Sequence, residues 1–240
     1  NAFVKGTFYK VLATIMQKLA HKIICVSEYQ ASFLQQKKCV ITVPNALPQN
    51  FVNRLTPNFQ AAFKRKHILM LGSLKLYKSP LEFIELTKRL PQFIFVLVIN
   101  DTKENINIFI KEYKINISKN LTIYPQQNDV VPFYNQTSLV LNLSNKKQFV
   151  ETFGLTALEA MSAGLPVIVP TEGGIAGMVV DGENGYKIDV QNLNQIAECI
   201  KTILSDETLY MELAQNALAY SKRFSEAKMV NSIEMILNRK

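Results

Sequence analysis

The chain has 240 residues, of which 48% are hydrophobic and 19% are charged, and its formal net charge is +8. This composition is typical of a globular protein that has enough apolar residues for a core. No run of about 18 apolar residues is present, so the sequence contains no predicted membrane-spanning helix.

Two further kinds of site are excluded by the residue types. The lysines are dispersed, and no basic cluster alternates with aromatic residues, so we expect no nucleic-acid partner. Two histidines and three cysteines, without metal or Cys-x-x-Cys spacing, give no zinc site, so we expect no metal. We interpret the cysteines as buried thiols of a reducing compartment and, because no signal peptide is recognisable, expect a cytoplasmic protein.

Residues 1–45 predict two short strands and two helices. The expected elements are a helix at Phe3–Leu19, a strand at Ile23–Val26, a helix that Ser27 caps and that runs to Leu34, and a strand at Val40–Val43. The first helix is rich in lysine. We favour its packing on a sheet; the alternative is a membrane-surface helix that gives the protein a peripheral contact with the inner face of a membrane.

This first segment is short for a domain. A doubly wound domain needs roughly 100 residues, whereas a proline-containing connector already follows at residues 46–66. We therefore expect residues 1–45 to be a remnant of a first domain whose larger part is absent. The alternative is a single sheet domain with an N-terminal extension docked on it.

From residue 67 onward, predicted strands alternate with predicted helices. The strands are His67–Leu71, Phe93–Ile99, Leu121–Ile123, Leu139–Leu143, Val167–Val169 and Gly185–Ile188. The helices begin at a capping box at Ser79, at Asn105, Asp129, Gly154, Gly174, Leu193, Glu207 and Ser225. This alternation predicts an α/β fold, a Rossmann-like parallel sheet with helices on both faces, over residues 67–222, followed by a C-terminal helix at 223–240.

Ligands of such sheets bind at the carboxyl ends of the strands. The loops there are Gly72–Lys78, Ile99–Thr102, Tyr124–Asn128, Ser144–Gly154 and Thr171–Gly174. We expect these loops to share one crevice, which would bring Lys78, Glu151, Gly154 and Glu159 together.

The stretch from Phe149 to Val169 carries the most specific pattern. Glu151 and Glu159 are eight residues apart, and Gly154 lies between them before a predicted helix that ends at Gly164. The free amides and the dipole at a helix start favour an anion such as phosphate. A carboxylate accepts two hydrogen bonds and therefore suits a vicinal diol such as that of a ribose or a hexose.

This stretch resembles the E-x7-E motif of retaining glycosyltransferases of family 4, which have the GT-B fold. The resemblance continues through Ala163-Gly164-Leu165-Pro166, Gly173-Gly174 and Asp181-Gly182-Glu183-Asn184-Gly185-Tyr186, and it covers most of the chain. It implies that residues 67–222 form the nucleotide-sugar donor-binding domain and residues 1–45 belong to the acceptor-side domain.

The resemblance also implies roles for individual residues. Glu159 would hold the ribose of the donor, and Glu151 would contact the donor sugar. Lys78 matches a lysine that acts on the pyrophosphate, so the implied catalytic residues are Glu151 and Lys78. The implied donor-binding residues are Gly72, Ser73, Phe153, Gly154, Leu155 and Glu159.

Two positions depart from the family pattern. Ser73 stands where family members often have an arginine, and Gly177 stands where they usually have a glutamate. Lys75 is near enough to substitute for the arginine, but a lysine is a point charge and not a bidentate fork.

The function implied is transfer of a sugar, with retention, from a nucleotide diphosphate sugar to a glycan or a lipid-linked acceptor in surface polysaccharide synthesis. No cofactor and no metal are expected. Two alternatives stay open, namely a nucleotide-sugar-binding fragment without activity of its own and another GT-B enzyme that cleaves or isomerises a nucleotide sugar. A glycoside hydrolase fits poorly, because its two carboxylates must face each other across the sugar.

Overall fold

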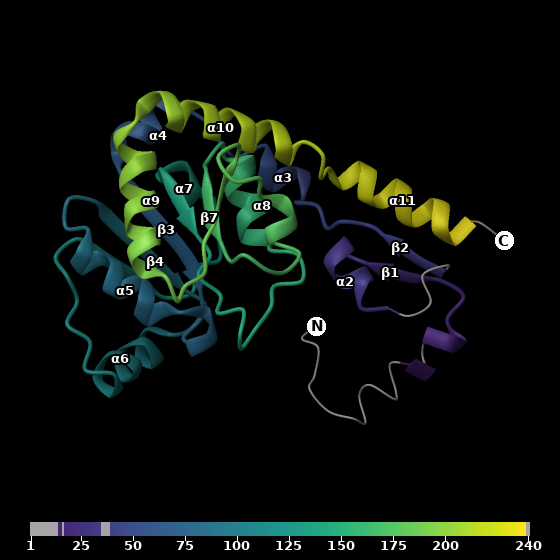
Figure 1. Cartoon of the computed structure of the whole chain (residues 1–240), viewed down its shortest axis with the longest axis horizontal. Helices are drawn as coiled ribbons and strands as arrows, with labels where there is room; N and C mark the ends of the chain where they lie inside the picture. The colour runs from purple at the N-terminus through teal and green to yellow at the C-terminus, as the bar shows by residue number, and fades with distance from the viewer. Residues whose placement is uncertain (1–13, 16, 35–38, 239–240) are drawn as a thin grey trace.

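The computed structural model describes residues 14–15, 17–34 and 39–238. Most of the predicted helix Phe3–Leu19 lies outside the described residues, and of its described part Thr14, Ile15 and residues 17–19 are helical. Figure 1 shows a large α/β body and, beside it, a small part that contains β1, β2 and α2. No helix among the described residues is long and apolar enough to cross a membrane.

The large body is built on a six-stranded sheet in the order β5-β4-β3-β6-β7-β8. All its strand pairs are parallel. The strands are β3 (His67–Gly72), β4 (Ile94–Ile99), β5 (Leu121–Tyr124), β6 (Leu139–Leu141), β7 (Val167–Val169) and β8 (Gly185–Lys187). The predicted α/β fold with a parallel sheet is therefore confirmed.

Helices cover both faces of this sheet. From β3 the chain moves to β4 and β5 in one direction, whereas β6, β7 and β8 follow in the other. Right-handed crossovers in opposite directions put their helices on opposite faces. In agreement, α5 (Pro80–Arg89) packs on α9 (Leu193–Ser205), whereas α10 (Glu207–Ser221) packs on α4 (Phe59–Arg65) and α8 (Leu155–Ser162).

The remaining helices are shorter or peripheral. They are α3 (Gln49–Val52), η2 (Leu76–Lys78), α6 (Lys103–Glu112), α7 (Val131–Asn135), η3 (Ala176–Met178) and α11 (Glu226–Asn238). The predicted connector 46–66 thus contains two helices, α3 and α4, that the sequence analysis missed. The helix expected from Gly174 is only the short 3₁₀ turn η3.

The central strands are apolar because both faces of a parallel sheet are covered. All residues of β6 and β7 are buried, with at most 1% of each side chain exposed. The strand β3 lies between β4 and β6 in the sheet, so the strand order reverses between β3 and β6. A crevice forms at such a switch point, outside the carboxyl ends of the strands.

The small part consists of two parallel strands, β1 (Ile23–Cys25) and β2 (Val40–Thr42), with the helix α2 (Glu28–Ser32) between them. Ser27 caps α2 as predicted, because its side chain accepts a hydrogen bond from the Gln30 amide. The hydroxyl of Ser27 also donates to the Thr152 carbonyl oxygen of the large body, at 2.5 Å. The bounds of the two parts as separate domains stay a prediction.

The cysteine prediction needs a correction. Cys25 is buried in β1, but Cys39 and Cys199 are partly exposed. Cys39 directly precedes β2, and Cys199 lies in the middle of α9, where it packs against the core without being fully buried.

Candidate active site

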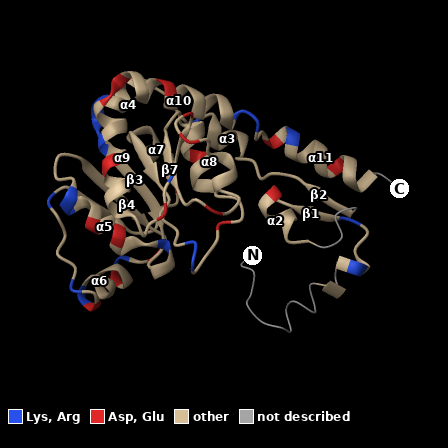
Figure 2. Cartoon of the chain, in the orientation of Figure 1, with Lys and Arg blue, Asp and Glu red and all other residues tan. Residues whose placement is uncertain are grey.

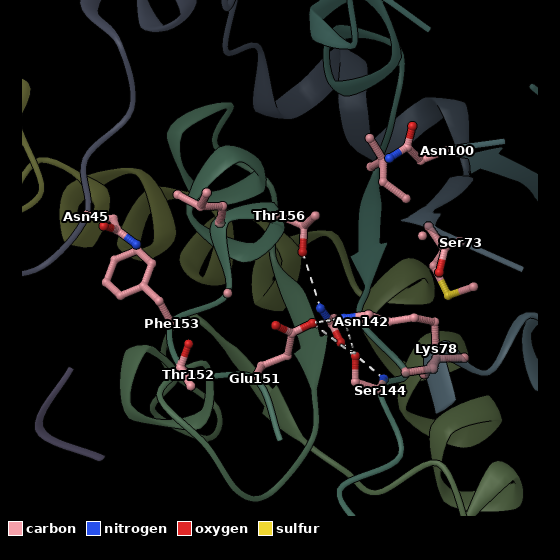
Figure 3. Close-up of a pocket in the computed structure, with 16 residues that line it drawn as sticks. Asn45, Ser73, Lys78, Asn100, Asn142, Ser144, Glu151, Thr152, Phe153 and Thr156 are labelled. Atoms are coloured by element: carbon pink, nitrogen blue, oxygen red, sulfur yellow. Dashed lines mark hydrogen bonds and ion pairs between the residues drawn. The ribbon is translucent and has the colours of Figure 1, made fainter. Parts of the chain in front are cut away.

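A cavity of about 480 Å³ opens at the switch point of the sheet (Figure 3). It is lined by the ends of β3 and β6 and by the segment that leads into α8. Its polar lining residues are Asn45, Ser73, Lys78, Asn100, Asn142, Ser144, Glu151, Thr152 and Thr156. The cavity also contains Gly72, Phe153, Gly154 and Leu155, so every predicted site residue except Glu159 lines it.

An ion pair between Lys78 and Glu151 lies on the wall of this cavity. The two side chains are 22% and 18% exposed. Ser144 bridges them, because its hydroxyl oxygen lies 3.4 Å from Lys78 Nζ and the hydroxyl donates to Glu151 Oε1 at 3.2 Å. Glu151 is thus the counter-ion of Lys78, and any anion that binds Lys78 competes with this carboxylate.

The position of Lys78 is fixed by the turn that follows β3. Lys78 ends the 3₁₀ turn η2, and its ammonium lies 4.2 Å from the centre of the Phe149 ring. Phe149 stacks on Tyr77 with the ring centres 4.8 Å apart. The aromatic pair limits the rotamers of the lysine and directs its charge towards the cavity.

The helix after this turn begins as predicted, but its cap differs. Pro80 is the first residue of α5 and Ser79 precedes it, yet Ser79 makes no side-chain capping bond. Its backbone is left-handed, with φ 57° and ψ 47°, whereas a residue that caps a helix through its side chain typically has an extended backbone. The Ser79 hydroxyl is instead buried without a hydrogen-bond partner among the described residues.

The N-terminus of α8 faces the cavity through Gly154, Leu155 and Thr156. Gly154 has φ +94°, and a Cβ atom on it would lie 2.5 Å from Ile175, so no other residue fits without movement. The positive end of the helix dipole therefore points at the place where an anion would bind. The far end closes as predicted, with Gly164 in the left-handed conformation after the last turn.

Glu159 lies one turn beyond these residues, on the same face of α8. Leu155, Thr156 and Glu159 are the three residues of α8 that are not buried. The Glu159 carboxylate accepts a hydrogen bond from the hydroxyl of Tyr134. Burial raises the pKa of the Glu159 carboxyl, and the hydrogen bond from Tyr134 lowers it.

No group of three or more His, Cys, Asp or Glu side chains in the described part of the chain is placed to hold a metal ion. The cavity presents one lysine, one helix N-terminus and one carboxylate, Glu151. This is a set of groups that suits a phosphate-bearing sugar.

Comparison with known proteins identifies the family. The sequence profile of the family described as Glycosyl transferases group 1 matches residues 54–220. The chain belongs to this family.

Comparison with individual proteins agrees with this assignment. The chain is 29% identical over 239 residues to an uncharacterized glycosyltransferase of Methanocaldococcus jannaschii, covering 97% of this chain and 63% of the relative. It is also 29% identical over 142 residues to the N-acetyl-alpha-D-glucosaminyl L-malate synthase of Bacillus anthracis, covering 59% of this chain and 36% of the relative. The chain thus spans less than two thirds of the length of either relative.

Solved structures show the same fold. The Anabaena protein Alr3699/HepE in complex with UDP-glucose superposes with a TM-score of 0.80 at 20% identity, over 96% of this chain and 67% of that one. The sucrose-phosphate synthase of Thermosynechococcus elongatus also gives 0.80 at 20% identity, over 96% and 61%.

The structure of this group 1 glycosyl transferase chain corrects the predicted loop set. Three of the five strand-end loops contribute to the cavity, whereas Tyr124–Asn128 and Thr171–Gly174 do not line it. The sequence analysis missed the amide side chains Asn45, Asn100 and Asn142 and the hydroxyl of Thr156. Asn142 carries a detectable signal, because it is a polar residue inside an apolar strand that the analysis extended to Leu143.

The pair Gly173-Gly174 approaches protein backbone in this structure. A Cβ atom on Gly174 would lie 1.8 Å from the Thr152 carbonyl oxygen, and one on Gly173 would lie 2.5 Å from the Glu151 carbonyl oxygen. The Gly174 amide donates to the Glu151 carbonyl at 2.8 Å. The two glycines therefore hold the segment that carries Glu151.

We expect Gly174→Ala to lower the free energy of unfolding by about 2–3 kcal/mol, because the added methyl group meets a backbone oxygen that cannot rotate away. Gly177→Ala is the matched control, since nothing lies within 4 Å of its Cβ position, and it should change stability by less than about 0.5 kcal/mol. Chemical denaturation of both variants measures the difference. Equal stability of the two would mean that the loop at Gly174 is free to move.

Proposed function

We propose that the protein to which this chain belongs transfers a sugar, with retention, from a nucleotide diphosphate sugar to an acceptor. In this proposal the chain carries the donor site. The observation that supports it most is the convergence of Lys78, Glu151 and the N-terminus of α8 on one cavity at the switch point of the sheet.

Each group has a chemical task in this transfer. As the bond between sugar and diphosphate breaks, negative charge grows on the leaving phosphate. Lys78 and the amide end of α8 are fixed positive groups that stabilise this charge. Glu151 accepts hydrogen bonds from hydroxyls of the donor sugar, and Glu159 accepts them from the ribose. Gly72 and Ser73 line the cavity at the end of β3, where this proposal puts the diphosphate.

The finer parts of the proposal rest on the family resemblance and on relatives. A neighbouring structure contains UDP-glucose, which supports a nucleotide sugar as donor. The acceptor we propose is a glycan or a lipid-linked glycan in surface polysaccharide synthesis, and the transfer we propose is independent of metal and cofactor. A peripheral contact with the inner face of a membrane would bring a lipid-linked acceptor to the site.

A thermal-shift panel tests the donor class. Ligand that binds the folded chain raises its stability by mass action, by about 2.7 kcal/mol at 100 times the dissociation constant. We expect UDP-, ADP- or GDP-sugars to raise the melting temperature by several degrees, and free hexoses to leave it unchanged. A panel in which no nucleotide or nucleotide sugar shifts the melting temperature would contradict the proposed donor site.

A further inference from the structure

Tyr134 is a buried phenol whose hydroxyl reaches a residue of α8. It lies on the short helix α7, and only 1% of its side chain is exposed. Its hydroxyl donates to Glu159 Oε2. The structure gives Glu159 no other hydrogen-bond partner among the described residues, so the phenol is the group that sets the orientation of this carboxylate.

The ring of Tyr134 is itself held in place by the segment between the two parts of the chain. Phe51 of α3 packs edge-on against the ring, with centroids 6.3 Å apart. The next residue, Asn135, bonds the Arg54 carbonyl at 3.1 Å and the Thr56 amide at 3.0 Å. These contacts hold α7 against the connector, and the hydroxyl therefore has little freedom to leave Glu159.

In this pair the phenol is the proton donor and the carboxylate is the acceptor. Burial and the nearby charge of Glu159 raise the pKa of the Tyr134 phenol well above its ordinary value, so the phenol stays a proton donor. A donor to a carboxylate stabilises its ionised form, so the hydrogen bond from Tyr134 partly offsets burial, which is the larger effect and leaves the Glu159 pKa raised. The second oxygen, Oε1, remains available on the face that Glu159 shares with Leu155 and Thr156, which line the cavity.

We propose that Tyr134 is a positioning residue for donor recognition, whose hydroxyl holds the Glu159 carboxylate in the orientation that binds the ribose diol. The proposal rests on the proposed function, because it needs a nucleotide in the cavity. It adds a residue that contacts no ligand itself and acts through Glu159.

The test compares UDP with 2′,3′-dideoxy-UDP as probes, because these two ligands differ only in the diol. The ratio of their dissociation constants reports the ribose contact and is insensitive to changes in the diphosphate site. For the parent chain we expect UDP to bind at least about tenfold more tightly, since hydrogen bonds to a charged group are strong. Calorimetry on the full 240-residue chain measures the ratio.

Three variants then separate the roles. Glu159→Gln should bring the ratio close to one, and Tyr134→Phe, which keeps the ring, should lower it about fivefold. Tyr210→Phe is the matched control. Tyr210 is fully buried and does not line the cavity, and its hydroxyl donates to the Ser138 carbonyl at 2.8 Å. Removal of this hydroxyl should therefore leave the ratio unchanged. In the double variant Tyr134→Phe/Glu159→Gln, the loss of the phenol should cause no further change, because it acts only through Glu159.

The outcomes distinguish this inference from the proposed function. The ribose role of Glu159, and the inference with it, is overturned if the parent chain binds UDP and 2′,3′-dideoxy-UDP equally. The same holds if the Glu159→Gln variant still prefers UDP. If Glu159→Gln abolishes the preference for UDP over 2′,3′-dideoxy-UDP and Tyr134→Phe retains it in full, the proposed function stands and the positioning role of Tyr134 is overturned. A Tyr134→Phe chain that fails to fold while Tyr210→Phe folds would assign the hydroxyl to stability instead.

Discussion

Replacement of Lys78 by alanine is expected to weaken nucleoside diphosphate binding by at least about thirtyfold, or about 2 kcal/mol. Two effects act in the same direction. The diphosphate loses its charge-assisted hydrogen bonds to the ammonium, and Glu151, which is 18% exposed, is left without its counter-ion beside the phosphates. Titration calorimetry of UDP, or of whichever nucleoside diphosphate binds in the thermal panel, measures this loss.

Lys88→Ala provides the control for net charge. Lys88 pairs with Glu85 on α5, is 52% exposed and does not line the cavity, so its loss should change affinity by less than about twofold. The double variant Lys78→Ala/Glu151→Gln should regain part of the affinity, because the unpaired carboxylate is removed. Equal losses for Lys78→Ala and Lys88→Ala would indicate general charge attraction in place of a specific phosphate contact.

Glu151→Gln is expected to change the affinities for two related ligands in opposite directions. Loss of the carboxylate releases Lys78 from its ion pair, so a nucleoside diphosphate should bind about three- to tenfold more tightly. The corresponding nucleotide sugar, by contrast, loses the hydrogen bonds that its sugar hydroxyls donate to the carboxylate, and it should bind more weakly. The ratio of nucleotide sugar affinity to nucleoside diphosphate affinity should therefore fall at least about tenfold.

Asp189→Asn is the matched control for this experiment. Asp189 pairs with Lys146 at 2.7 Å and is 24% exposed, so it is a similar carboxylate–lysine pair in a neighbouring loop, but it does not line the cavity. Both ligands should bind this variant like the parent. If Glu151→Gln weakens both ligands equally, Glu151 supports the shape of the site and does not contact the sugar.

Most of the regular elements of the large body follow from local patterns in the sequence. Val167–Val169 was predicted with the bounds that the structure shows, and Gly164 ends α8 as its sequence suggested. Such elements are predictable because a run of apolar residues, a glycine with positive φ and a proline act on their immediate neighbours.

The helices α3 and α4 could not be predicted in this way. Both are short, and helices of this length are not stable by themselves in water. They form because tertiary contacts support them, as where the Ser138 hydroxyl bonds the Ala62 carbonyl of α4 at 2.6 Å. The predicted capping box at Ser79 was wrong for a related reason. The turn η2 places Ser79 in a left-handed conformation, which the local sequence does not reveal.

The sequence by itself determined the α/β class, the parallel sheet and the motif that carries Glu151 and Glu159, since each depends on periodicity or on residues close together in the chain. Only the tertiary structure decided which charges meet. Lys78 and Glu151 are 73 residues apart, and Tyr134 and Glu159 are 25 apart. Their contacts exist because parallel strands bring the carboxyl-end loops to one edge of the sheet and because the Tyr134 side chain of α7 reaches Glu159 of α8. Because tertiary packing determines these residue pairs, no fixed spacing in the sequence predicts them.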